Sequence, residues 1–163
     1  TLDEIGEIDL TVDGADEFDP ALCLVKGGGG AHLREKMVAM NSKRMIVIAD
    51  ASKQVARLGA FPLPVEVVQF AHGVSARAVA RAFAAEGITV ETRLRKAKDG
   101  SNYISDNGNF ILDCVNSGIA DPGALAARLD GISGLVEHGL FVGLCFAVYL
   151  GSEEGVAVIG KNP

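Results

Sequence analysis

The sequence predicts an α/β protein in which a parallel β-sheet carries an inserted α+β lobe. In the first 50 residues, short apolar segments alternate with a helical segment. Prolines at positions 62 and 64 mark a change in pattern, and the residues after them have the order strand, helix, strand, strand, helix, strand. We therefore expect a Rossmann-like domain, incomplete in extent, at residues 1–62 and 143–163, and a ferredoxin-like lobe at residues 63–142.

Three short apolar segments are expected to be strands of the first domain. An apolar–polar alternation at residues 8–12 and apolar runs at residues 22–25 and 45–49 have the period and length of strands. Ligands of parallel sheets bind outside the carboxyl ends of the strands. The charged residues at those ends are Asp13, Lys26 and Asp50.

A helix is expected at residues 31–42, between the second and third of these strands. Leu33, Met37 and Met40 are spaced i, i+4, i+7, which places one apolar stripe on the helix. A strand, a helix and a further strand in this order imply a right-handed crossover between parallel strands.

The lobe is expected to follow the order β-α-β-β-α-β. Gly87 ends its first helix, Asp121 and Pro122 open its second, and a tight turn at residues 106–109 joins its two middle strands. The predicted elements are residues 65–70, 75–86, 89–95, 110–115, 121–129 and 135–142. Residues 156–159 are expected to return to the first sheet.

The composition is that of a folded, acidic protein. Of the 163 residues, 48% are apolar and 22% charged, and the net charge is -6 at pH 7. This charge argues against a protein whose main role is binding nucleic acid or an anionic membrane. The longest apolar run, residues 139–150, is shorter than the ~20 residues of a membrane helix.

The cysteines and histidines favour a reducing, cytoplasmic location without a metal. Cys23, Cys114 and Cys145 are odd in number and far apart, so no disulfide framework is expected. The three histidines lack the spacing of a zinc site, which needs three or four converging ligands.

The segment Asp13-Gly14-Ala15-Asp16-Glu17 places three carboxylates within five residues at a predicted strand end. Acidic turns are common on protein surfaces, because Asp stabilises turns and caps helices. The alternative is that one carboxylate points into a cleft while a neighbour caps the chain behind it.

Four glycines follow Lys26, from Gly27 to Gly30. They cost backbone entropy on folding, and they allow backbone N–H groups to approach a ligand at the start of the predicted helix. The segment is therefore a candidate cradle for an oxyanion or phosphate, with a flexible turn as the alternative. It is not a Walker A loop, because its lysine precedes the glycines, and Leu33 breaks the dinucleotide-binding pattern.

Glu35 and Lys53 complete the candidate set. Glu35 lies in the early turns of the predicted helix, where its carboxylate either lies in solvent and interacts favourably with the helix dipole, or lines the cleft. Lys53 is expected in the first turn of a short helix that is capped at Asp50 and ends at Gly59. A cation is disfavoured there by the dipole, so Lys53 is either a flexible surface residue or a ligand-binding one.

Five motifs in order resemble the ribose-5-phosphate isomerase A family: DGADE, KGGGGAHLREK, IADASKQV, FPLPVEV and DNGN. The resemblance extends from Ile8 to Gly160. It implies a cofactor-free enzyme of the pentose phosphate pathway, homodimeric or homotetrameric, that interconverts ribose 5-phosphate and ribulose 5-phosphate. In the family a strand and a TGST-type phosphate loop precede DGADE, and we expect this chain to lack that segment.

The resemblance also assigns roles to residues. It implies that Glu35 is the general base, which moves a proton through an enediolate, and partial burial of Glu35 is expected because a base works better when shielded from water. The implied substrate-binding residues are Asp13, Gly14, Ala15, Asp16, Lys26, Gly27, Gly28, Gly29 and Lys53.

Other functions use the same residues differently. A sugar-phosphate-binding regulatory module would need the glycine loop without a base. An inactive fragment of the isomerase would bind without turnover. A third possibility is an acyl-CoA-handling enzyme of similar fold, in which a glutamate acts as nucleophile.

Overall fold

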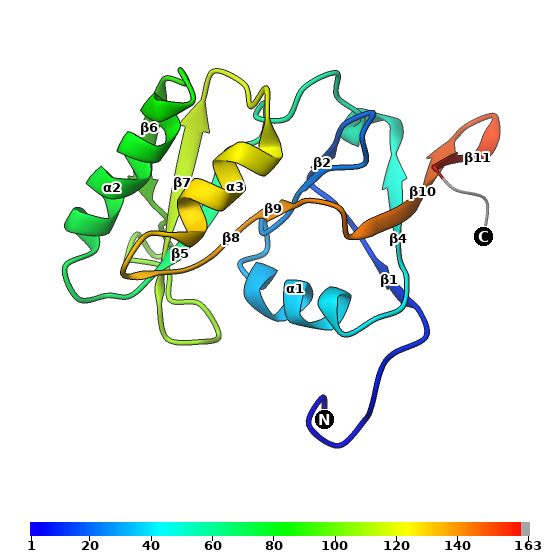
Figure 1. Cartoon of the computed structure of the whole chain (residues 1–163), viewed down its shortest axis with the longest axis horizontal. Helices are drawn as coiled ribbons and strands as arrows, with labels where there is room; N and C mark the ends of the chain where they lie inside the picture. The colour runs from blue at the N-terminus through cyan, green and yellow to red at the C-terminus, as the bar shows by residue number, and fades with distance from the viewer. Residues whose placement is uncertain (161–163) are drawn as a thin grey trace.

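The computed structural model describes residues 1–160, whose strands form three sheets (Figure 1). The first sheet has the order β1-β4-β10-β11, and β4 runs parallel to both β1 and β10. β11 returns antiparallel to β10, which confirms the expected return of residues 156–159. The strands are β1 (Thr11–Asp13), β4 (Met45–Asp50), β10 (Cys145–Ser152) and β11 (Gly155–Gly160).

The second sheet contains the predicted strand at residues 22–25, and placing that strand in the parallel sheet was wrong. β3 (Leu24–Val25) pairs antiparallel with β2 (Glu17–Phe18) and with β9 (Leu140–Phe141). The reason is a tight turn, in which Asp19 Oδ1 accepts hydrogen bonds from the N–H groups of Ala21 and Cys23. This turn folds β3 back on β2, so the crossover of the parallel sheet joins β1 to β4.

The predicted helix is α1 (His32–Met40), but its apolar stripe is not its buried face. Met37 and Met40 are 54% and 70% exposed, whereas His32, Lys36 and Ala39 are buried. The helix turns this face inward because the Lys36 ammonium reaches acceptors on the lobe, described below.

The lobe has the predicted ferredoxin-like order, with an antiparallel sheet β6-β7-β5-β8. Both helices cover one face of the sheet, around a core that includes Val79, Phe83, Leu125 and Leu129. Asp121 caps the second helix through Ala124 N–H, as predicted. The elements are β5 (Leu63–Val67), α2 (His72–Ala85), β6 (Val90–Leu94), β7 (Phe110–Asn116), α3 (Pro122–Asp130) and β8 (Leu135–His138).

The other face of the lobe sheet is directed towards the first domain. In Figure 1, β2, β9 and α1 lie between the lobe and the parallel sheet. The predicted strand at residues 135–142 is divided into β8 and β9 at Gly139, whose N–H bonds Pro64 and whose carbonyl accepts from Lys26 N–H. Domain boundaries at residues 62 and 142 remain a prediction.

The connection after β4 is shorter than expected. Asp50 accepts a hydrogen bond from Ser52 N–H, which confirms the predicted cap, but the helix is a 3-10 turn, η1 (Ala51–Lys53), and does not reach Gly59. It ends there because the chain becomes extended at Gln54, where it bridges to Phe18 in β2. Among the helices of residues 1–160, none combines the length and apolar character needed to cross a membrane.

Candidate active site

A polar cavity of about 240 Å³ lies beyond the carboxyl end of β1. Three segments build it: the acidic turn after β1, the glycine loop after β3, and the first turn of α1. Its lining residues are Asp13, Gly14, Ala15, Asp16, Lys26, Gly27, Gly28, Gly29 and Glu35. The structure thus brings together every predicted site residue except Lys53.

Lys26 lies at the centre of the charged groups. Its side chain is only 4% exposed, and Nζ donates a 2.6 Å hydrogen bond to the carbonyl of Gly14. Nζ also lies 3.0 Å from Asp13 Oδ2 and 3.2 Å from Glu35 Oε2, and 5.5 Å from the centre of the Phe141 ring. A buried ammonium needs such partners, and here the carboxylates come from two different segments.

Glu35 faces this cavity from the first turn of α1, and its partial burial is as expected. Its side chain is 28% exposed, yet Oε2 is buried and has no hydrogen-bond partner among residues 1–160, apart from the ion pair with Lys26. A carboxylate that lines a polar cavity is suited to take a proton from a bound molecule.

The glycine loop approaches Asp16 too closely for a side chain. Gly28 N–H donates a 2.8 Å hydrogen bond to Asp16 Oδ2, and a Cβ at Gly28 would lie 2.6 Å from Asp16 Oδ1. Gly30 has a φ of +83°, and a Cβ there would lie 2.5 Å from the Tyr103 hydroxyl. The loop therefore needs glycine both for conformation and for contact with its neighbours.

Lys53 does not line this cavity. It is half-buried at the end of η1, on the connection that follows β4, and it is not among the lining residues. Its role in substrate binding stays a prediction.

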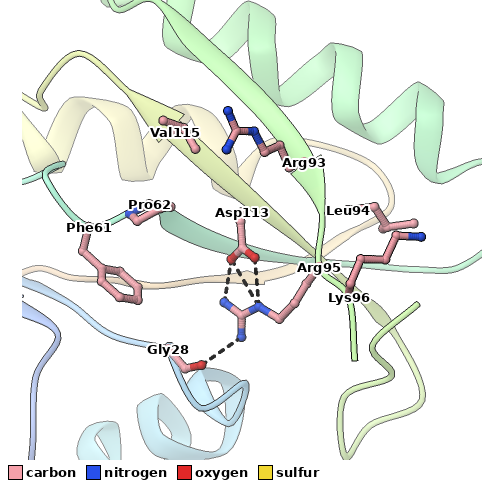
Figure 2. A pocket seen from close by; sticks show the side chains of 9 residues that line it. All are labelled: Gly28, Phe61, Pro62, Arg93, Leu94, Arg95, Lys96, Asp113 and Val115. Atoms are coloured by element: carbon pink, nitrogen blue, oxygen red, sulfur yellow. Dashed lines mark hydrogen bonds and ion pairs between the residues drawn. The ribbon is translucent and has the colours of Figure 1, made fainter. Parts of the chain in front are cut away.

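Residues of the lobe also reach the glycine loop, and the motifs did not reveal them. Arg95 donates hydrogen bonds to the carbonyls of Gly27 and Gly28 while it pairs with Asp113 on β7 (Figure 2). Tyr103 donates to the carbonyl of Gly29. The signal was present in the alternation of Glu91, Arg93 and Arg95, which puts charge on one face of β6, but the sequence does not say what that face covers.

His32 is a second residue that the motifs did not reveal. It is fully buried beneath Gly27, and neither ring nitrogen has a hydrogen-bond partner within residues 1–160. Burial lowers its pKa below the usual value, so the ring is neutral at pH 7.

A separate, partly buried cluster joins α1 to the lobe. Lys36 Nζ lies 2.5 Å from Glu137 Oε1 and donates to the carbonyl of His138, and His138 Nε2 lies 3.1 Å from Asp130 Oδ1. Asp130, Glu137 and His138 have ligand atoms within 4.8 Å of one another, which is compatible with a metal ion. The Lys36 ammonium already neutralises Glu137, so the cluster serves better as a structural ion pair.

Comparison with known proteins places the chain among isomerases. A family model described as ribose 5-phosphate isomerase A (phosphoriboisomerase A) matches residues 1–155. Ribose-5-phosphate isomerase A of Bradyrhizobium diazoefficiens is 53% identical, over 99% of this chain and 69% of that protein.

Solved structures of ribose 5-phosphate isomerases have the same fold as this chain. Ribose 5-phosphate isomerase A from Methanocaldococcus jannaschii superposes with a TM-score of 0.86 at 39% identity, covering 99% of this chain and 69% of the other. Ribose 5-phosphate isomerase from Plasmodium falciparum gives a TM-score of 0.89 at 33% identity, covering 97% and 68%.

Proposed function

The chain belongs to the ribose 5-phosphate isomerase A family, and from this we propose that it interconverts ribose 5-phosphate and ribulose 5-phosphate, with Glu35 carrying the proton. The observation that supports this mechanism best is the Lys26 ammonium held between Asp13 and Glu35 at the wall of a polar cavity.

Glu35 is the proposed base. Conversion of an aldose to a ketose removes a proton from C2 and delivers one to C1, with an enediolate between the two steps. A single carboxylate beside both carbons serves both transfers, because it is a base in the first step and an acid in the second. Glu35 Oε2 is buried against Lys26, so the other carboxylate oxygen, Oε1, is the proposed proton carrier on the cavity side.

Lys26 is the proposed electrostatic partner of the enediolate. Its ammonium has three N–H donors, and one is used in the bond to Gly14. The other two face Asp13 Oδ2 at 3.0 Å and Glu35 Oε2 at 3.2 Å, so Lys26 acts on the substrate through its charge. Because the ammonium is fixed before substrate arrives, it stabilises negative charge on the substrate oxygen without reorganising.

The cavity is more suited to the sugar than to the phosphate. Asp13, Asp16 and Glu35 place three carboxylates against one ammonium, so a phosphate would be repelled. Asp13 and Asp16 are suited to accept hydrogen bonds from sugar hydroxyls and to assist ring opening. The phosphate is then expected outside the cavity, where Lys53 is our candidate for a cation.

Replacement of Glu35 by Gln tests the assignment. Glu35→Gln keeps the shape and removes the base, so we expect kcat to fall by about 10²- to 10⁴-fold while circular dichroism and substrate binding are retained. Exchange of the substrate C2 hydrogen with deuterated water should fall in parallel. Glu154→Gln, in the exposed turn between β10 and β11, is the matched control.

Near-native turnover of a folded Glu35→Gln protein would show that Glu35 is not the base. Binding without turnover in the wild type would instead support the regulatory module.

We also propose that the protein acts in the cytoplasm as a homodimer or homotetramer. The three cysteines are free thiols, and burial raises the pKa of Cys145 to about 11, which keeps it unreactive. Light scattering on the purified protein tests the assembly.

A further inference from the structure

The carbonyls of three successive glycines are held by side chains of the lobe. Arg95 Nη1 donates to Gly27 O at 2.9 Å and to Gly28 O at 3.2 Å. The Tyr103 hydroxyl donates to Gly29 O at 3.3 Å. Glycine backbones are the most mobile in the unfolded chain, so a loop of four glycines needs contacts of this kind to adopt one conformation.

The guanidinium that binds the loop is itself fixed. Asp113 on β7 accepts from Arg95 Nη2 at 2.6 Å and from Nε at 3.1 Å, and the Tyr103 ring centre lies 5.8 Å from the guanidinium carbon. The Arg95 side chain is 12% exposed. Figure 2 shows the arrangement, with Asp113 on one side of the guanidinium and Gly28 on the other. Its charge is balanced by Asp113, so its effect on the loop depends on the direction of its N–H groups.

These bonds, together with the 2.9 Å bond from Gly30 N–H to Gly27 O within the loop, determine where the loop N–H groups point. In a trans peptide, the carbonyl of one residue and the N–H of the next point in opposite directions. Because Gly27 O is turned to Arg95, Gly28 N–H is turned to the cavity, where it bonds Asp16. Because Gly28 O is also turned to Arg95, Gly29 N–H is turned to the same side as the cavity that Gly29 lines.

We propose that Arg95 is a positioning residue for the isomerisation, which holds the glycine loop so that its N–H groups face the enediolate and Asp16 before the reaction begins. The inference rests on the proposed function. Donors that are already oriented stabilise the charge that develops in the transition state, and they do so without a cost of reorganisation. Arg95 touches neither substrate nor Glu35 in this role, and it acts through the loop.

The test compares Arg95→Lys with Arg93→Met. Lysine keeps the charge beside Asp113 but has no fork to bind Asp113 and two carbonyls together. Arg93 is two residues earlier on the same face of β6, is 60% exposed and pairs with Glu91, so its loss should leave kcat unchanged. For Arg95→Lys we expect kcat to fall about 10- to 100-fold, with KM within about threefold, because the lost donors act mainly in the transition state.

Two further measurements separate positioning from stability. Added guanidinium at low millimolar concentration should restore part of kcat to Arg95→Ala, and the Gly29 amide should exchange faster with deuterated water in Arg95→Lys than in the wild type. An active wild type beside an Arg95→Lys protein with wild-type kcat would overturn this inference alone. The inference would also be overturned if added guanidinium did not restore the kcat of Arg95→Ala and the loss of kcat matched the loss of folded protein. A wild type without isomerase activity would overturn the proposed function as well.

Discussion

The contact between Gly28 and Asp16 predicts the effect of one added methyl group. In Gly28→Ala the new Cβ would lie 2.6 Å from Asp16 Oδ1, so the carboxylate must move and give up its 2.8 Å bond to the backbone N–H. The φ of Gly28 is not in the left-handed region, so alanine itself is not strained there. The contact with Asp16 is then the only cost.

The magnitude follows from that one bond. A hydrogen bond to a charged acceptor contributes about 1.5–3 kcal/mol, and this one is exposed to solvent, so we take about 1.5 kcal/mol, equivalent to about tenfold. We expect kcat/KM for ribose 5-phosphate to fall about tenfold if Asp16 orients the sugar. The free energy of unfolding should fall by only about 0.5–1 kcal/mol, because alanine also restricts the unfolded chain.

The assay is the initial rate of ribulose 5-phosphate formation, combined with urea unfolding. Gly29→Ala is the matched control for stability, because a Cβ there meets no atom of residues 1–160 within 4 Å and its φ is also outside the left-handed region. It should be as stable as the wild type, or up to about 1 kcal/mol more stable. Wild-type kcat/KM in a folded Gly28→Ala protein would refute the reasoning, since it would mean that the loop accepts a methyl group without moving Asp16.

Two other predictions concern stability. Lys36→Met leaves Glu137, which is 18% exposed, without its cation, so the free energy of unfolding should fall by about 2–4 kcal/mol. The control Lys43→Met, on the surface, should change it by less than about 1 kcal/mol. Equal effects of the two variants in urea unfolding would contradict this. Burial lowers the pKa of His138 to about 4. The unfolded chain, with a His pKa near ~6.5, therefore takes up its proton first as the pH falls, and the fold loses stability between about pH 6.5 and 4, by at most ~1.4 kcal/mol per pH unit. His138→Gln should reduce this slope in urea unfolding measured from about pH 7 to about pH 5, and an unchanged slope would show that other groups cause it.

Much of the candidate site was predictable because its parts are local. The acidic turn and the glycine loop each lie within five residues, so each was recognisable as a candidate by itself. That they meet was inferred from a shared parallel sheet, to which β3 does not belong. The order of elements in the lobe was predictable for the same reason, since the period of apolar residues and the turn signals at Gly87 and Asp121 depend on neighbours in sequence.

The sequence by itself therefore determined most of the helices and strands, though not β2 or the short extent of η1, and it determined which carboxylates and cations follow them. Only the tertiary structure decided that β3 joins a small antiparallel sheet and that α1 buries Lys36 instead of its methionines. It also decided that Lys53 does not line the cavity, and that Arg95 binds the glycine loop from 67 residues away. The physical reason is that periodicity reports which side of an element is apolar, whereas the partner of a polar group is set by which distant segments the packing brings within hydrogen-bonding distance.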